Sequence, residues 1–243
     1  MPMSWAVPSA PDQPPPPLAL AAEAPRAAFG LAELAAHWRA LGQGPRGKGD
    51  PVMVLPGLFN GDGSNRVLCA HLRRLGHAAE GWGLGRNLGP RTIGADGEAL
   101  IDRIEAMSAR AGAPVALVGI SLGGIMARIV AHRRPDCVRA VVTISSPYAG
   151  HPRATNVWRP FEWFCGTPVD DPSVGAWLAE AAGPLPVPAT AIWSRSDGLV
   201  NGLICRSADA RAVEVRSSHL WVQMRAPVLA AVAEALAVET PGG

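Results

Sequence analysis

The sequence predicts a single three-layer α/β domain with a mainly parallel sheet of about six strands. Two observations support this prediction. At 243 residues the chain is long enough for one large domain with a sizeable core. From residue 51 onward, short apolar runs alternate with segments of helical spacing. Strands that alternate with helices pair in parallel through right-handed crossovers, so helices are expected to cover both faces of the sheet.

The individual elements follow from the spacing of apolar residues. Leu31, Leu34, Trp38 and Leu41 recur at helical intervals and predict an amphipathic helix over 29–42, which ends in glycine. The predicted strands are the apolar runs 52–55, 77–82, 115–120, 138–145, 189–193 and 212–215. The predicted helices between and after them are 64–75, 96–111, 122–134, 174–182 and 226–238.

Proline dominates the beginning of the chain. Residues 1–28 hold a dense share of the 24 prolines, including the run Pro14 to Pro17. Proline lacks the N–H that helices and sheet interiors need. We therefore expect a disordered tail over 1–28 and a folded domain over 29–243.

One long interval interrupts the alternation of strands and helices. More than 40 residues separate the strand ending near Ser145 from the strand beginning near Ala189, and this interval is rich in tryptophan and phenylalanine. A structureless loop of that length is unusual inside a compact domain. The sequence thus predicts a small lid insertion over about 148–186, with helix of its own.

Composition excludes several classes of protein. A formal net charge of +2 gives no electrostatic reason to bind nucleic acid. No apolar run reaches the roughly 18 residues that span a bilayer, so no stable membrane insertion is expected. The first residues have neither a basic segment nor an uninterrupted apolar one, as a secretory signal would. We expect a cytoplasmic protein.

The cysteines give no sign of a metal site. Cys69, Cys137, Cys165 and Cys205 are scattered, with no CxxC pair and no histidine at ligand spacing. Reduced, mostly buried thiols are the simplest interpretation, and a Cys165–Cys205 bridge stays open as an alternative. Two glycine-rich stretches, "GQGPRGKG" and "GWGLGRNLG", lack the residues and the strand-to-helix context of nucleotide-binding loops. No metal or organic cofactor is expected.

A serine between two glycines is the strongest chemical signal in the chain. In "GISLG", Ser121 lies between Gly119 and Gly123, directly after a predicted strand and directly before a predicted helix. A serine on such a turn is held at a strained positive φ, and small residues two positions away relieve the crowding. The turn lifts the hydroxyl above the sheet, so Ser121 is the candidate nucleophile.

A serine hydroxyl needs a base to activate it, and that base needs an acid to orient it. For a nucleophile on this kind of turn, the acid and then the histidine follow in the chain. Of the histidines after Ser121, His132 lies inside the next predicted helix and His151 precedes any suitable acid strand. His219, just after the last predicted strand, is the candidate base.

The candidate acid is chosen by its place on a strand. Asp197 follows the predicted strand 189–193 in the turn-like "SRSDG". Active sites of parallel sheets form at the carboxyl ends of strands, which is where this aspartate falls. Asp171, in the predicted lid, is the second choice.

Two backbone amides are expected to bind the oxyanion. The amide of Leu122 follows the nucleophile at the start of a helix, whose N-terminus favours negative charge. The second amide should come from the loop after the first strand, where Pro56 and Gly57 turn the chain. Leu58 is the first choice for this donor, and Phe59 is the alternative.

These segments resemble bacterial α/β-hydrolases of the esterase and lipase type. The resemblance covers about residues 29 to 240. The segments that carry the resemblance are "VLPGLFNGDGSNRVLCAHLRRLGHAAEGWGLGRNLGP", "GISLGG", "VVTISSPYAG", "SRSDGLV" and "SSHLW". It implies the three-layer α/β-hydrolase fold and a Ser-Asp-His triad at Ser121, Asp197 and His219.

The match departs from the family in two places. Pro56 replaces the usual histidine of the oxyanion turn, and Ser218 and Trp221 stand where relatives tend to have glycines around the histidine. Arg86 and Asn87 are similarly typical of a subgroup, with bracing of the loop and contact with substrate as alternative roles.

Aromatic residues near the candidate site suggest an apolar pocket. The chain has eight tryptophans and one tyrosine, several of them in the predicted lid. Phe59, Tyr148 and Trp221 are the candidate substrate-binding residues, and Ser145 and Ser146 are expected to help shape the pocket.

The leading hypothesis is a serine hydrolase that cleaves short to medium acyl or aryl esters through an acyl-enzyme. Its partner would be a small-molecule ester, and the sequence leaves the oligomeric state open. An acyltransferase or thioesterase with the same triad is the alternative within enzymes. A non-catalytic binding protein on the same scaffold is the alternative outside them.

Overall fold

The computed structural model describes residues 10–238, and within this range it contains a six-stranded sheet. Its strands are β1 (Pro51–Leu55), β2 (Ala78–Gly81), β3 (Val115–Ile120), β4 (Val138–Ile144), β5 (Ala189–Trp193) and β6 (Arg211–Glu214). All neighbours pair in parallel, in the order β2-β1-β3-β4-β5-β6. The predicted parallel sheet of about six strands is confirmed, with β3 and β5 at their predicted bounds.

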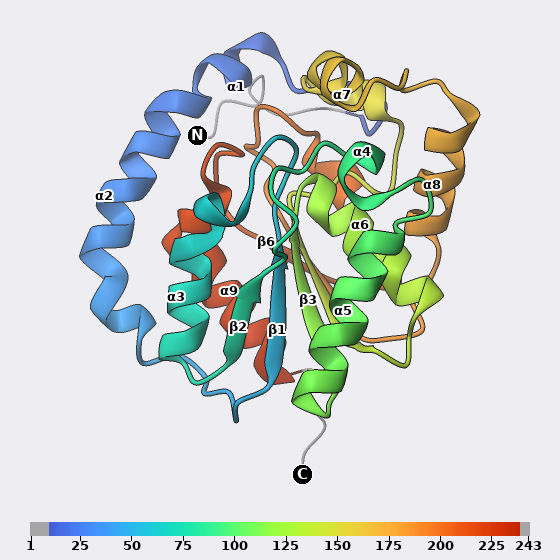
Figure 1. Cartoon of the computed structure of the whole chain (residues 1–243). Helices are drawn as coiled ribbons and strands as arrows, with labels where there is room; N and C mark the ends of the chain where they lie inside the picture. Colours follow the sequence, from blue (N-terminus) through green and yellow to red (C-terminus); the bar gives the residue numbers. More distant parts are fainter. Residues whose placement is uncertain (1–9, 239–243) are drawn as a thin grey trace.

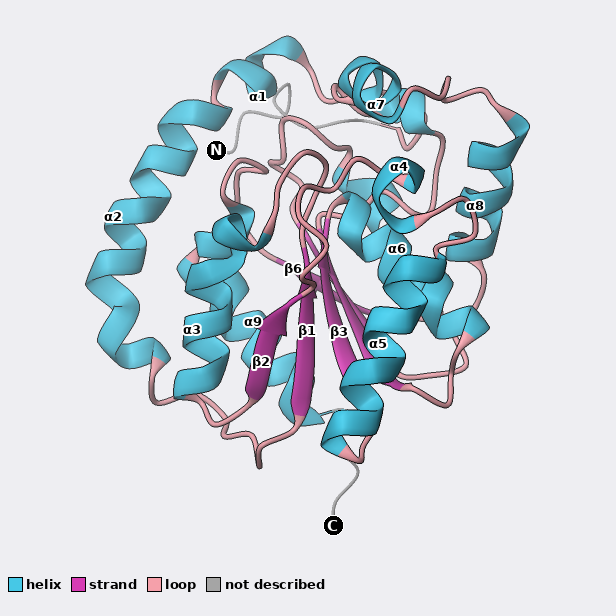
Figure 2. Cartoon of the chain, in the orientation of Figure 1, coloured by secondary structure: helices cyan, strands magenta, loops and turns pink. Residues whose placement is uncertain are grey.

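Helices lie on both faces of this sheet, as Figures 1 and 2 show. The helices are α1 (Pro17–Ala21), α2 (Glu23–Leu41), α3 (Arg66–Arg74), α4 (Pro90–Ile93), α5 (Glu98–Ala111), α6 (Leu122–Arg133), α7 (Trp158–Cys165), α8 (Pro172–Ala182) and α9 (Ala226–Val238). Short 3₁₀ turns lie at Asp62–Asn65, Pro152–Ala154, Gly202–Cys205 and Val222–Met224. The fold is the predicted three-layer α/β architecture.

Alternation along the strands builds two apolar layers. In β1, Val52 and Val54 pack in the layer that contains α3 and α9, whereas Met53 and Leu55 pack in the layer that contains α5 and α6. All four side chains are fully buried. A strand buried on both faces reads as a continuous apolar run, which is how these segments appear in the sequence. α2 packs outside the first layer, against α9 (Figure 1).

The direction in which the chain adds strands to the sheet reverses between β1 and β3. β1 has β2 on one side and β3 on the other, so the connections after β1 and after β3 leave in opposite directions. In open parallel sheets, ligands bind at the carboxyl ends of strands where the order reverses in this way. The loop after β1 and the turn after β3, which carry Leu58 and Ser121, meet at this point.

The long interval between β4 and β5 contains the helices α7 and α8. α8 packs against α6, where the fully buried Arg128 donates hydrogen bonds to the carbonyls of Ala181 and Gly183. α7 lies over the carboxyl ends of the strands (Figure 1). The expected helical content of this segment is present, and its role as a lid stays a prediction.

We expected a disordered tail over 1–28, and the structure contradicts this expectation for the described part, residues 10–28. Residues 1–9 lie outside the described range, but α1 and the start of α2 are helical. Pro17 opens α1, and Pro25 falls in the first turn of α2. A helix does not use the N–H of its first turn, so proline is tolerated there. The prolines mark helix starts in this segment instead of excluding helices.

The four cysteines are free thiols in the structure, so Cys165 and Cys205 do not form a bridge. Burial raises the pKa of the Cys165 thiol to about 11 and raises that of Cys205 well above its ordinary value. Between residues 10 and 238, no helix has the length and apolar character needed to cross a bilayer.

Candidate active site

Ser121 occupies a strained turn between β3 and α6. Its φ of 51° is positive, which non-glycine residues rarely adopt. A Cβ added at Gly119 would lie 2.4 Å from the carbonyl oxygen of Gly123, and one added at Gly123 would lie 2.6 Å from the carbonyl oxygen of Leu55. Larger residues cannot occupy these two positions without moving the backbone. The GxSxG pattern is therefore explained by close contact between β1, β3 and α6.

The loop after β1 packs directly beside this serine. A Cβ added at Gly57 would lie 3.3 Å from the Cβ of Ser121. The amides of Leu58 and Leu122 donate no hydrogen bond within residues 10–238, whereas the amide of Phe59 donates to the carbonyl of Asn87 at 2.7 Å. Of the two alternatives for the second donor, Leu58 is therefore favoured over Phe59.

Asn87 braces the loop after β1. Its side chain is fully buried, and its Nδ2 donates to the carbonyl of Pro56 at 2.7 Å. Its backbone N–H donates to the carbonyl of Asn60 at 2.8 Å. Arg86 stacks on the ring of Phe59, 4.7 Å from the centroid. Of the two roles considered for Arg86 and Asn87, these contacts favour bracing.

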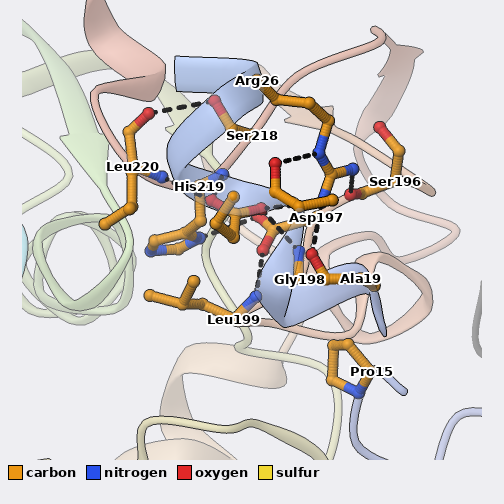
Figure 3. A network of polar contacts seen from close by, with 12 residues as sticks. Pro15, Ala19, Arg26, Ser196, Asp197, Gly198, Leu199, Ser218, His219 and Leu220 are labelled. Atoms are coloured by element: carbon orange, nitrogen blue, oxygen red, sulfur yellow. Dashed lines mark hydrogen bonds and ion pairs between the residues drawn. The ribbon is translucent and has the colours of Figure 1, made fainter. Parts of the chain in front are cut away.

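Asp197 and His219, which lie on separate loops, are joined by a hydrogen bond. The Nδ1 of His219 lies 2.8 Å from the Oδ2 of Asp197 (Figure 3). The other oxygen, Oδ1, accepts the backbone N–H groups of Leu199 and Val200, each at 2.9 Å. Asp197 is 1% exposed, so its carboxylate has a fixed position and a full set of partners. The Nε2 edge of the imidazole faces away from this carboxylate.

The pKa of His219 is set by opposing effects. Burial lowers it, but the charge of Asp197, the hydrogen bond that the imidazole donates to that carboxylate and the charge of Glu23 together raise it above the ordinary value of 6.5. The imidazolium form is thus stabilised where a base would have to accept a proton.

Glu23 is a residue of this site that no sequence pattern indicated. It lies in the first turn of α2, is 2% exposed, and accepts the backbone N–H of His219 at 2.7 Å. Nearly 200 residues separate the two partners, and a lone glutamate among prolines carries no local sign of such a contact. Only the position of α2 in the fold reveals it.

The structure does not join all three members of the predicted triad. Within residues 10–238, no hydrogen bond links the Ser121 hydroxyl to His219. The second choice for the acid, Asp171, instead caps α8, where it accepts the N–H of Ser173 at 2.8 Å. The acid–base pair of Asp197 and His219 and the serine turn are thus present as separate parts at the same end of the sheet.

A cavity of about 330 Å³ opens beside Ser121. Its walls come from α6, α7, α8 and the loops around them, and include Leu58, Leu122, Trp158, Phe161 and Trp177. Among the described residues, no charged side chain lines it, and His219 is outside its wall. The cavity therefore suits an uncharged, apolar group.

The three predicted substrate-binding residues do not line this cavity. Phe59 packs on Phe164, with ring centroids 4.4 Å apart. Tyr148 is 1% exposed and lies against Arg128, so it belongs to the core beneath α8. Trp221 is half exposed. Aromatic type and closeness in sequence to the candidate site pointed to these residues, whereas the packing of α7 and α8 decides which side chains form the wall.

Comparison with known proteins gives two kinds of result. No family model matches the sequence, and no curated protein matches it. Many solved structures share its fold.

Three of these structures illustrate the likeness. The mature lipase BlEst2 of Bacillus licheniformis has a TM-score of 0.59 and 16% identity over 79% of this chain and 94% of that chain. The monoacylglycerol lipase of Paleococcus ferrophilus has a TM-score of 0.57 and 17% identity, covering 81% and 97%. A structure from work on LipS and LipT, two metagenome-derived lipolytic enzymes, has a TM-score of 0.56 and 17% identity, covering 80% and 95%. The chain therefore has the α/β-hydrolase fold.

Proposed function

We propose that the protein is a serine hydrolase that cleaves carboxylic esters. The observation that supports this most strongly is the hydrogen bond of 2.8 Å between His219 and Asp197, at the same end of the sheet as the strained turn of Ser121. Carboxylate-oriented imidazoles serve as general bases for serine nucleophiles on unrelated folds. The similar fold of lipolytic enzymes supports the same assignment.

In the first half of the reaction, the Ser121 oxygen attacks the ester carbonyl while the Nε2 of His219 takes the hydroxyl proton. For this transfer, Ser121 and Nε2 must come within hydrogen-bond distance when substrate binds, since catalytic hydrogen bonds often form fully only in the complex with substrate. The amides of Leu58 and Leu122 hold the oxyanion, and the N-terminus of α6 favours its charge. The intermediate collapses, His219 gives its proton to the departing alcohol, and the acyl group stays on Ser121.

In the second half, water replaces the alcohol. His219 takes a proton from that water as it attacks the acyl carbon, and the ester bond to Ser121 breaks. The proton returns to the serine oxygen and the carboxylic acid leaves. Asp197 stabilises the imidazolium in both halves without taking its proton.

The cavity indicates the substrate class. About 330 Å³ is at the small end of the roughly 300–1,000 Å³ typical of small-molecule sites. With tryptophan and leucine side chains in its wall and no charged group among the described lining residues, it suits a short to medium acyl or an aryl group.

The test is hydrolysis of p-nitrophenyl esters of increasing chain length by the purified protein and by Ser121→Ala. We expect turnover of the shorter esters, and a loss of about 10⁴-fold or more in kcat/KM in the variant. Equal turnover by both proteins would contradict the assignment of Ser121.

A fluorophosphonate probe separates the remaining functional classes. Covalent labelling together with ester turnover supports the esterase. Labelling without turnover would indicate acyl transfer or a thioester substrate, and neither labelling nor turnover would indicate a binding protein.

A further inference from the structure

One carboxylate connects the two loops that carry Asp197 and His219. The Oε2 of Glu23 accepts the backbone N–H groups of His219 at 2.7 Å and Leu220 at 2.9 Å. The Oε1 of the same side chain accepts the N–H of Gly198 at 2.8 Å. Glu23 therefore binds the residue that follows the proposed acid and the backbone of the proposed base.

The surroundings of Glu23 are built for a carboxylate. The side chain is 2% exposed, and a buried carboxylate is costly unless hydrogen-bond donors surround it. Besides the three amides, the guanidinium of Arg26 lies 3.3 Å from Oε1. Arg26 also donates to the carbonyls of Ala19 and Ser196, and these hydrogen bonds connect α1 to the loop that carries Asp197, called the acid loop below (Figure 3).

The N-terminal segment docks closely on the acid loop. A Cβ added at Gly198 would lie 2.3 Å from the carbonyl oxygen of Ala19, so the two backbones are in direct contact. The Nδ2 of Asn156 donates to the carbonyl of Pro15 at 3.0 Å, and the Nδ2 of Asn201 donates to the carbonyl of Gln13 at 2.8 Å. Glu23 is thus held in place by contacts along the whole segment.

We propose that Glu23 is a positioning residue of the active site: its carboxylate fixes the loops of Asp197 and His219 relative to each other and places a second negative charge near the imidazole. This inference rests on the proposed function, because it assigns His219 as the base. Glu23 acts through backbone amides and is not among the residues that line the cavity.

Glu23 acts on His219 through its charge as well as through hydrogen bonds to the backbone. A residue with only a structural role would not have the effect of charge. The groups whose charges act on His219 are Asp197, which is hydrogen-bonded to the ring, and Glu23, which itself pairs with Arg26. The charge of Glu23 contributes to the raised pKa of His219. Removal of that charge alone should therefore lower the pKa of the imidazole.

The test compares Glu23→Gln with Glu33→Gln, a matched control on the same helix. The Glu33 carboxylate pairs with Arg225 at 3.0 Å, at the far end of the segment that carries His219. It accepts none of the amides of Gly198, His219 and Leu220 that Glu23 binds. For each protein, the pKa of His219 is measured by NMR titration, with the resonance assigned by its loss in His219→Gln. kcat and KM are measured with a p-nitrophenyl ester over the same pH range.

We expect Glu23→Gln to lower the pKa of His219 and to reduce kcat about tenfold, with KM changed by less than about twofold. The acid limb of the pH profile should move to lower pH by the same amount as the NMR pKa. Glu33→Gln should leave both the pKa and kcat at the wild-type values. Glu23→Asp, which restores the charge on a shorter side chain, should recover the pKa.

An unchanged pKa of His219 in Glu23→Gln would overturn the inference, as would equal losses of kcat in Glu23→Gln and Glu33→Gln. If Glu23→Gln does not fold, the Glu23→Asp variant decides. The inference would also be overturned if the pKa of His219 fell in Glu23→Asp by as much as it falls in Asp197→Asn, which lacks the charge beside the ring. The NMR titration does not need activity. Absence of esterase activity in the wild-type protein would contradict the proposed function. A lowered pKa of His219 in Glu23→Gln would still support the contact between Glu23 and His219.

Discussion

Ser121 lies on a turn between two elements of the buried core, whereas Asp197 and His219 lie on loops that are held together by the N-terminal helices. Around Ser121 the contacts are between backbones: Gly119 and Gly123 allow β1, β3 and α6 to approach closely. Around His219 they are polar and come from a carboxylate on α2. The two parts of one proposed site thus depend on different kinds of interaction.

This difference explains why a short stretch of sequence predicts the serine turn but not the surroundings of His219. The serine turn is determined by its neighbours in the chain, because its strain and its close contacts require small residues two positions away. The acid–base pair needs groups from opposite ends of the chain. A change near Ser121 should therefore affect packing and catalysis together, whereas a change around His219 should act mainly through charge and orientation.

The largest expected effect in this comparison is that of Asp197→Asn. The substitution keeps the shape of the side chain but removes its charge and changes which tautomer of His219 it stabilises, so kcat should fall about 10³–10⁴-fold. The thermal unfolding midpoint and the circular dichroism spectrum show whether the fold is kept. A loss of less than about tenfold in a folded variant would show that Asp197 does not orient the base.

An intermediate effect is expected when the serine turn is crowded. In Gly123→Ala, the new Cβ would lie 2.6 Å from the carbonyl oxygens of Leu55 and Pro56, which must move apart. We expect a loss of about 1–3 kcal/mol in the free energy of unfolding and a loss of about 10²-fold in kcat/KM, because the oxyanion loop shifts.

The matched control for this variant is Gly175→Ala in α8, where an added Cβ meets no atom within 4 Å. Chemical denaturation and ester kinetics measure both proteins. Wild-type values for Gly123→Ala, or equal losses in the two variants, would refute the close-packing explanation of the GxSxG pattern.

The sequence was sufficient for the strands and for the longer helices, because continuous apolar runs such as 115–120 indicate buried strands and helical spacing of apolar residues indicates the helices between them. It also indicated Asp197 and His219, each of which follows a strand of the sheet, and the structure joins the two by a hydrogen bond. It failed for α1 and for the first residues of α2, where proline content concealed helix starts. It also failed for the wall of the cavity, because the packing of α7 and α8 depends on contacts that no local pattern encodes.

A smaller effect follows from the raised pKa of His219. As a base His219 must be neutral, so the acid limb of kcat/KM should lie above the ordinary value of 6.5. The effect of pH on stability runs the other way. Because the folded state binds the His219 proton more tightly, protonated His219 contributes fully to the free energy of unfolding below its unfolded pKa. This contribution is lost as pH rises through its pKa in the folded protein.

The difference in free energy of unfolding between wild type and His219→Gln measures this contribution. We expect it to become smaller as pH rises from below 6.5 to above the folded pKa of His219. A difference that grows over this range would show that burial, and not the charges of Asp197 and Glu23, dominates the pKa.

The most direct test of the central claim is the rate and position of fluorophosphonate labelling, followed by mass spectrometry of the digested protein. If Ser121, His219 and Asp197 act as one unit, the adduct will be on Ser121 and its rate of formation will fall at least about 10²-fold in His219→Ala. An adduct on another residue, or a rate at Ser121 that does not depend on His219, would contradict this account.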